Sequence, residues 1–317
     1  MLIWLVLIPL IAAALIGLCK APARPTALLS ASLTLALGIW ALVSFDGCSS
    51  CWSRFEGMDL QLTLAPALSK VMLLLTILVT FATVLGTNPP QGGEASWYNS
   101  ALLISAGATG AFLSDNIISF FAFHELALIP TFVMIGLYGR GDRRTTAWRA
   151  TLYLGLASMV LLAALLMIGT QAGFTFSGLK DFMASGRELA HAELIGALLI
   201  AGFGTLISLF PFHSWAAPAY ASAPAPVAMM HAGVLKKFGL YGLFMFQPLM
   251  ETGFLPWTNI LLVLLVCNVI WVGYVTVNQK RLDLLLGNSS VMHMGYIFLA
   301  FAALVVSGSA EANPWAL

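Results

Sequence analysis

Long apolar runs alternate with short polar connections along almost the whole chain. A helix needs about 20 apolar residues to cross the hydrocarbon core of a bilayer, where lipid offers the backbone no hydrogen-bond partners. Ten runs come near this length, and we expect each to be a membrane helix. They cover residues 2–18, 26–45, 62–85, 100–113, 116–137, 150–168, 194–209, 227–246, 260–277 and 290–306. The pattern predicts an all-α, polytopic membrane protein.

Composition agrees with this class. Of the 317 residues, 60% are hydrophobic and 9% are charged, whereas an ordinary soluble domain has about 25% charged residues. The formal net charge of +1 argues against a nucleic acid as partner. The first run has no basic residues before its apolar core, so we expect a retained helix and not a signal peptide. No linker or low-complexity tract interrupts residues 1–317, which we treat as a single membrane domain.

Basic residues in the connections give an orientation, because short cytoplasmic loops carry an excess of Lys and Arg. Eight basic residues follow odd-numbered predicted helices and three follow even-numbered ones. The eight are Lys20, Arg24, Arg140, Arg143, Arg144, Arg149, Lys280 and Arg281, and the three are Arg54, Lys180 and Arg187. The distribution predicts that the N-terminus lies outside the cytoplasm.

Two polar segments stand apart from the apolar runs. Cys48 and Cys51 form a C-x-x-C in the second connection, which the orientation places outside, where a disulfide persists. A metal site needs two further ligands, and the neighbouring residues offer only carboxylates. We expect either a small local disulfide or two free thiols. Residues 171–193 have apolar positions at roughly helical spacing, which indicates either a short amphipathic helix at the interface or a solvated loop.

Glu125 lies inside the apolar run 116–137. An ionisable group at the centre of a membrane helix costs roughly 2.5–3.5 kcal/mol on insertion scales, so such groups mark functional sites. Pro130 leaves the carbonyl of Leu126 without its usual helical donor, which creates a polar position next to Glu125. We expect Glu125 to be a proton site that responds to nearby positive charge. The alternative is a protonated glutamic acid hydrogen bonded to a neighbouring helix.

Lys236 and Lys237 lie in the run 227–246. Consecutive helical residues are about 100° apart, so the two lysines are expected to face different ways. Lys237 shares a predicted face with Gly233, which leaves room for water or a close neighbour. We expect Lys237 to lie in a proton path and Lys236 to pair elsewhere in the protein.

Four prolines lie within sixteen residues, between the lysine-bearing run and the run before it. They are Pro211, Pro218, Pro224 and Pro226. Proline removes a backbone donor and clashes with the preceding turn, so the helix before it must kink or stop at Pro211. Broken membrane helices are tolerated where protein or a water-filled cavity satisfies the freed carbonyls. The sequence predicts a hydrated site at this break.

Three stretches carry a family resemblance. They read FFAFHELALIPTFVMIGLYG from Phe120, PFHSW followed by SAPAPVAMMHAGVLKKFGLYG between Pro211 and Gly242, and RLDLLLGNSSVMHMGYIFLAF from Arg281. They resemble the antiporter-like proton-pumping subunits of respiratory complex I, with subunit M, or chain 4, of NADH:quinone oxidoreductase as the most similar. The resemblance implies fourteen helices in two inverted five-helix repeats, each with a broken helix and a half-channel. On this scheme residues 1–98 are N-terminal helices, 99–248 the first repeat, and 249–317 the start of an incomplete second repeat.

The resemblance also implies site residues. Glu125 matches the family's fifth-helix glutamate and Lys237 its eighth-helix lysine, while His213 and His293 match histidines that we expect to act as proton relays. Leu206 stands where the family has a seventh-helix lysine, and Lys236 is an alternative source of that missing charge. Residues 216–220 read AAPAY in place of LPDAH, and the chain ends before the second repeat is complete.

The function implied is proton translocation by a membrane subunit of NADH:quinone oxidoreductase in the inner membrane of a bacterium. The sequence has no dinucleotide fingerprint, P-loop or iron–sulfur cysteine set. We therefore expect no cofactor or metal on this chain, with NADH, FMN, iron–sulfur clusters and quinone on partner subunits of the membrane-embedded complex. The alternatives are a subunit of a multi-subunit sodium-type cation/proton antiporter, the membrane arm of a hydrogenase or inorganic-carbon uptake complex, and a non-conducting structural paralogue.

Overall fold

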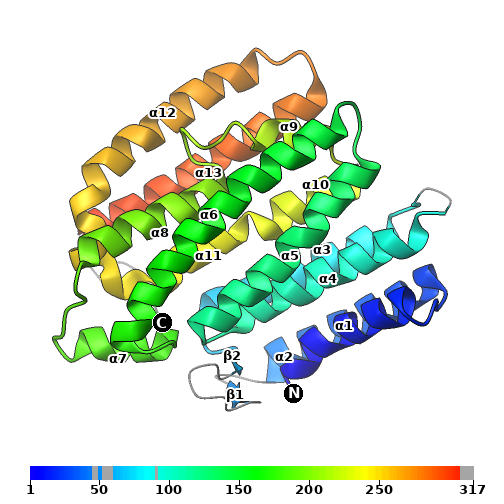
Figure 1. Cartoon of the computed structure of the whole chain (residues 1–317), viewed down its shortest axis with the longest axis horizontal. Coiled ribbons are helices and arrows are strands. Elements are labelled where there is room, and N and C mark those ends of the chain that lie inside the picture. The colour runs from blue at the N-terminus through cyan, green and yellow to red at the C-terminus, as the bar shows by residue number, and fades with distance from the viewer. Residues whose placement is uncertain (45–48, 52–59, 90–91, 308–317) are drawn as a thin grey trace. The chain divides into compact units, whose positions relative to one another are not determined.

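Helices make up almost all of the computed structural model, which describes residues 1–44, 49–51, 60–89 and 92–307 (Figure 1). The α-helices are α1 (Ile3–Gly17), α2 (Ala23–Ser44), α3 (Ala67–Leu85), α4 (Glu94–Leu113), α5 (Ile117–Tyr138), α6 (Arg143–Ala172), α7 (Phe176–Ala184), α8 (Ala192–Ile207), α9 (Ala216–Ser222), α10 (Ala225–Met230), α11 (Lys237–Met245), α12 (Thr258–Val277) and α13 (Leu282–Ser307). Two π-helical turns, η1 (His231–Leu235) and η3 (Met250–Phe254), and two 3₁₀ turns, η2 (Gln247–Leu249) and η4 (Leu255–Trp257), complete the helical elements. The all-α prediction is confirmed.

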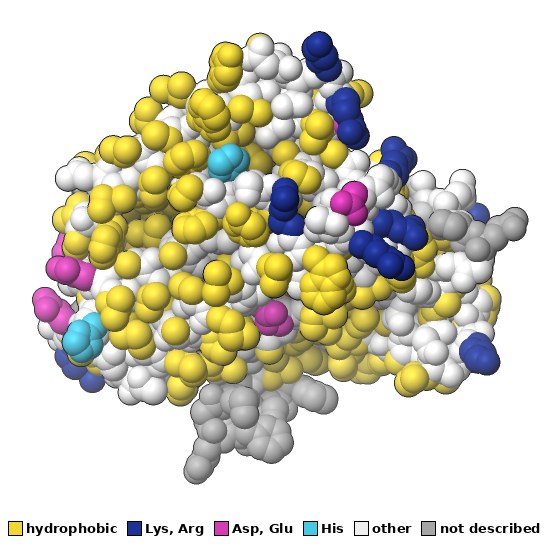
Figure 2. All heavy atoms as spheres, turned by 45° about the horizontal axis from the view of Figure 1, so that its top comes forward, with side chains coloured by type: hydrophobic (Ala, Val, Ile, Leu, Met, Phe, Trp, Pro, Cys, Tyr) yellow, Lys and Arg dark blue, Asp and Glu magenta, His cyan; other side chains and the backbone are white. Residues whose placement is uncertain are grey.

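Six helical segments among the described residues are long and apolar enough to cross a bilayer. They are Ala23–Ser44, Ala67–Leu85, Ile117–Tyr138, Arg143–Ala172, Gln247–Val277 and Leu282–Ala303, and shorter apolar helices cover Ile3–Gly17 and Ala192–Ile207. Each of the ten predicted runs has a helix within it, although the count of ten spans is only approximate. Hydrophobic side chains spread over much of the surface in Figure 2, as expected for a protein whose solvent is lipid.

One predicted helix boundary was wrong, and one predicted helix is interrupted. The run 62–85 begins as a strand, because β2 (Gln61–Thr63) pairs antiparallel with β1 (Ser49–Cys51), and its helix starts only after Pro66. The run 227–246 is divided by the π-helical turn η1. An apolar run shows that a segment is buried or in lipid, but it does not distinguish a short strand or a π turn from regular helix.

The chain folds as two compact units. One unit contains residues 1–137 and 225–235, and the other contains residues 138–224 together with those from Lys236 onward. In the first unit, apolar side chains of α1, α3 and the segment around β2 form a core whose members are fully or almost fully buried. They include Leu2, Leu5, Val6, Leu62, Leu64, Leu73 and Ile77.

The polar segment 171–193 contains a short helix, α7. Of the two alternatives predicted for this segment, the short helix is confirmed and the solvated loop is not. The hydroxyl of Thr175 accepts a hydrogen bond from the amide of Gly178 at 3.0 Å and caps the start of α7. Phe176 and Leu179 are the buried residues of this helix.

The predicted Cys48–Cys51 pair depends on Cys48, which lies outside the described residues.

Candidate functional site

The seventh predicted membrane helix is broken where the prolines begin. Helix α8 ends at Ile207, four residues before Pro211. Ser208 takes a left-handed conformation with φ of 64°, and the amide of Leu209 donates a hydrogen bond to the carbonyl of Gly204 at 2.7 Å. This geometry ends a helix and turns the chain away from its axis. The prediction that the helix stops by Pro211 is confirmed.

Two side chains satisfy the backbone around this break. Asn268 of α12 is fully buried; its Oδ1 accepts from the amide of Phe210 at 3.1 Å, and its Nδ2 donates to the carbonyl of Val291 at 3.3 Å. The indole of Trp215 donates to the carbonyl of Thr205 at 3.2 Å. Protein groups therefore replace part of the lost helical bonding. Asn268 was not predicted as a site residue. The sequence signal for it is a single amide side chain within the apolar run 260–277.

His213 lies on the turn between α8 and α9. It is partly buried, and its ring stacks on Phe210 with centroids 5.3 Å apart and an interplanar angle of 24°. The next residue, Ser214, donates from its hydroxyl to the phenol oxygen of Tyr153 on α6 at 3.0 Å. The break therefore carries an imidazole and a pair of hydroxyl groups.

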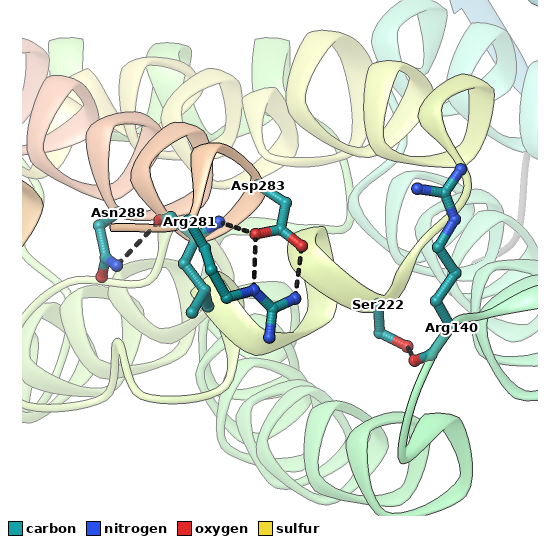
Figure 3. A network of polar contacts seen from close by, with 6 residues as sticks. Arg140, Ser222, Arg281, Asp283 and Asn288 are labelled. Carbon is teal, nitrogen blue, oxygen red and sulfur yellow. Dashed lines mark hydrogen bonds and ion pairs between the residues drawn. The ribbon is translucent and has the colours of Figure 1, made fainter. Parts of the chain in front are cut away.

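The far end of α9 is tied to the connection before α6. The amide of Arg140 donates to the carbonyl of Ser222 at 2.7 Å, and the Ser222 hydroxyl donates to the carbonyl of Arg140 at 2.9 Å (Figure 3). At the start of α13, the guanidinium of Arg281 makes two bonds to the carboxylate of Asp283, at 3.1 and 2.5 Å. Short helix α9 is thus anchored at its exit.

Lys236 is the most deeply buried cationic side chain in the second unit, with 1% of its surface exposed. Its amine donates to the hydroxyl of Ser290 on α13 at 3.3 Å and lies 5.0 Å from the ring centroid of Tyr220 on α9. A side-chain hydrogen bond also links Tyr220 and Ser290. Within the part of the chain that the structure describes, no carboxylate pairs with this lysine.

Lys237 is partly buried, and its amine lies 3.5 Å from the sulfur of Met294. The two lysines thus reach the same helix, α13, one turn apart. The two lysines were expected to face different ways. They contact different side chains, Ser290 and Met294, but both of these belong to α13. Leu206 is buried with 3% exposure, so α8 offers no amine at that position.

His293 is exposed on α13, three residues beyond Ser290. Its Nδ1 lies 2.7 Å from the carbonyl oxygen and 3.2 Å from the hydroxyl of Ser289, one turn earlier. These bonds orient the ring along its own helix. The lysines, Tyr220, Ser290, His213 and His293 all belong to the second unit.

Glu125 belongs to the first unit, on α5. Its side chain is 33% exposed, and its Oε1 lies 3.3 Å from Nδ1 of His124, which is almost fully buried. Consecutive helical residues point about 100° apart, but the flexible glutamate side chain brings the two groups together. Gly107 lets α4 approach α5 closely, because a Cβ there would lie 2.6 Å from the carbonyl of Phe123.

Comparison with known families decides what this arrangement belongs to. The family described as NADH:quinone oxidoreductase/Mrp antiporter, TM, matches residues 114–312. The chain belongs to this family. The matched region contains the glutamate, both lysines, the break and α13.

Relatives in the NADH:quinone oxidoreductase/Mrp antiporter family include NAD(P)H-quinone oxidoreductase chain 4 proteins of cyanobacteria. The chain is 32% identical over 243 residues to one from Microcystis aeruginosa, covering 74% of this chain and 43% of that protein. It is 30% identical over 259 residues to one from Picosynechococcus, covering 80% of this chain and 47% of that protein. The chain therefore spans less than half the length of these relatives.

Solved structures give the same family fold. A chain of respiratory complex I from Thermus thermophilus with bound NADH superposes with a TM-score of 0.83 at 26% identity, over 97% of this chain and 65% of that one. A chain of the Mrp complex from Dietzia superposes with a TM-score of 0.83 at 21% identity, over 97% of this chain and 34% of that one. The latter likeness is one of fold.

Proposed function

We propose that the chain is a proton-translocating membrane subunit of a complex I-type NADH:quinone oxidoreductase. The observation that carries the proposal is the pair of lysines at the start of α11, beyond a broken membrane helix, of which Lys236 is 1% exposed. Burying a charge in lipid or protein is costly, so membrane proteins keep ionisable groups there for transport and proton transfer. The family match supports this use of the lysines.

The proposed path uses groups that can gain and lose a proton. In the first unit, the contact at 3.3 Å between His124 and Glu125 gives the carboxyl a partner with which a proton can be shared. In the second unit, Lys237 and Lys236 hold the proton, and His213 and His293 are relays. A change in nearby charge changes the proton affinity of each group, which is how a driven transporter loads and releases protons.

The redox reaction belongs to partners in this proposal. NADH, FMN, iron–sulfur clusters and quinone bind to other subunits, and this chain contacts the other membrane-arm subunits and the bilayer. An assembly of this kind is supported by the names of the relatives and by the multi-subunit complexes in which the similar structures occur. We place the chain in the inner membrane of a bacterium, with its N-terminus outside the cytoplasm.

The test is NADH-driven proton uptake in membrane vesicles that contain the assembled complex. Glu125→Gln and Lys237→Ala remove one proposed proton carrier each, and we expect at least a tenfold loss of uptake with assembly intact. Lys280→Ala removes an exposed lysine from a connection and is the matched control, with uptake unchanged. Normal uptake in both path variants would refute the proposal and support a non-conducting subunit, which the loss of the amine at Leu206 would explain.

A second candidate is a subunit of a multi-subunit cation/proton antiporter. The observation that favours it is the fold likeness to the Mrp complex chain, with the same TM-score as the complex I chain. The two functions differ in driving force. Sodium-dependent proton movement in vesicles without NADH would support the antiporter, and uptake that requires NADH would support the oxidoreductase.

A further inference from the structure

Three residues from three elements meet around one buried amine. Lys236 precedes α11, Tyr220 lies on α9, and Ser290 lies on α13. The Lys236 amine is 3.3 Å from the Ser290 hydroxyl and 5.0 Å from the Tyr220 ring centroid, and the two hydroxyl-bearing side chains are hydrogen bonded to each other. Neither the family match nor the relatives' names assign a role to this trio.

We infer that Lys236, Tyr220 and Ser290 form a proton-holding site of the second unit, with Lys236 as a carrier in addition to Lys237. The inference rests on the proposed function, since it names the residues that hold the proton within that same path. The Ser290 and Tyr220 hydroxyl groups then form the exit from the amine.

The two lysines have chemically different neighbours. A hydroxyl accepts a hydrogen bond from an ammonium and donates one to a neutral amine, so it supports both protonation states. The partner of Lys237 is the thioether of Met294, a weak acceptor that has no proton to give. Among the contacts of the described residues, the hydroxyl partner of Lys236 can therefore pass a proton on, whereas the thioether beside Lys237 cannot.

Among the described residues of the second unit, no carboxylate pairs with Lys236, and this keeps its proton exchangeable. A lysine paired with a buried carboxylate is held in its charged form, because separation of the pair leaves both charges unsolvated. Among the described residues Lys236 has the Tyr220 ring face and the Ser290 hydroxyl as partners and no carboxylate. The aromatic face favours the ammonium only moderately.

Transfer through the hydroxyls conserves atoms and charge. The ammonium N–H bond breaks as an O–H bond forms on Ser290, whose own proton moves to the Tyr220 oxygen, and the tyrosine's proton leaves to a water molecule. The amine is left neutral and the water becomes hydronium. Reversal of the same steps reloads Lys236.

Close packing fixes the hydroxyls in place. Gly287 lies one turn before Ser290, and a Cβ there would lie 3.0 Å from the Cα of Ala217 and 3.3 Å from the Cβ of Tyr220. This contact holds α9 against α13 at the level of the trio. Helix α11 in turn packs on α8 at Gly239, whose Cβ would meet Ile207, the neighbour of Leu206. Helix α11, which follows Lys236, thus packs against the helix that carries Leu206.

The test compares Ser290→Ala with Ser290→Thr in vesicles that contain the assembled complex, alongside Lys236→Met and the control Lys280→Met. NADH-driven proton uptake per NADH oxidised is measured. We expect a loss of at least tenfold in Lys236→Met and severalfold in Ser290→Ala, and near-normal uptake in Ser290→Thr, which keeps the hydroxyl. If Lys236→Met prevents assembly, the serine pair alone decides, because both variants keep the lysine.

Equal uptake in Ser290→Ala and Ser290→Thr would overturn the inference. Normal uptake in Lys236→Met together with loss in Glu125→Gln would also overturn it, while leaving the proposed function standing. Normal uptake in Lys236→Met, Glu125→Gln and Lys237→Ala would instead refute the proposed function itself.

Discussion

Gly239 gives a sharp test of how packing positions the lysines. It lies on α11, two residues beyond Lys237, and a Cβ added there would lie 2.5 Å from Cγ1 of Ile207 and 2.7 Å from the carbonyl oxygen of Phe203 on α8. The isoleucine can rotate, but the carbonyl belongs to a helix backbone and cannot. In Gly239→Ala, α11 must therefore move away from α8 by roughly 0.7 Å to reach ordinary van der Waals contact.

The cost follows from this clash. Overpacking of a well-packed interior destabilises by about 1–3 kcal/mol, and the better helix propensity of alanine returns at most about 1 kcal/mol. With the full offset, the net loss in the free energy of unfolding is up to about 2 kcal/mol. The Lys236–Ser290 bond is already 3.3 Å long, so a shift that lengthens it by this amount takes it beyond hydrogen-bond range. The melting temperature of the purified complex and the rate of NADH-driven proton uptake should both fall.

Gly155→Ala is the matched control. Gly155 also lies inside a helix of the second unit, α6, but nothing lies within 4 Å of the position of an added Cβ. We expect unchanged uptake and stability that is equal or higher by about 0.5–1 kcal/mol. If Gly239→Ala behaves like Gly155→Ala in both assays, the close approach of α11 to α8 does not position the lysines.

Two further changes test buried polar groups. Asn268→Leu leaves the amide of Phe210 without its acceptor, and we expect a loss of about 1–3 kcal/mol in unfolding free energy, measured by thermal denaturation; an unchanged melting temperature would show that water replaces the amide. The Thr76 hydroxyl donates to a backbone carbonyl at 2.8 Å, whereas the equally buried Thr109 hydroxyl has no hydrogen-bond partner among the described residues. Thr109→Val should therefore be the more stable of the two threonine-to-valine variants in the same denaturation assay, and the opposite order would indicate that a water molecule binds Thr109.

The sequence predicted the helices well because lipid leaves the backbone few choices. An apolar run of membrane length must satisfy its own hydrogen bonds, and helix is the simplest way to do so. Pro211 likewise predicted the break, since proline cannot continue the ladder of the preceding helix. Strand β2 was missed because Leu62 and Leu64 continue the apolar pattern of the helix that follows, and because pairing with Ser49–Cys51 depends on tertiary structure.

Which of the two lysines is the more deeply buried could not be predicted from the sequence, and the reason is geometric. The predicted face that joined Gly233 to Lys237 assumed about 100° per residue throughout. Residues 231–235 form a π-helical turn. Such a turn contains more residues than an α-helical turn, so it changes the direction in which the side chains of the following residues point. Lys236 is consequently the buried member of the pair in the structure. Helical-wheel arguments fail across such a turn, and the sequence has no reliable signal for one.

Asn268 joins the break to the lysine site. One end of its amide holds Phe210, at the break, and the other holds the carbonyl of Val291, the residue after Ser290. Helix α9, which carries Tyr220, begins directly after the same break. Both partners of Lys236 are therefore connected to the break, one through the chain and one through a buried hydrogen bond. A displacement of the break alters the surroundings of the amine without any change at the lysine itself, and a shift in those surroundings is what changes its proton affinity.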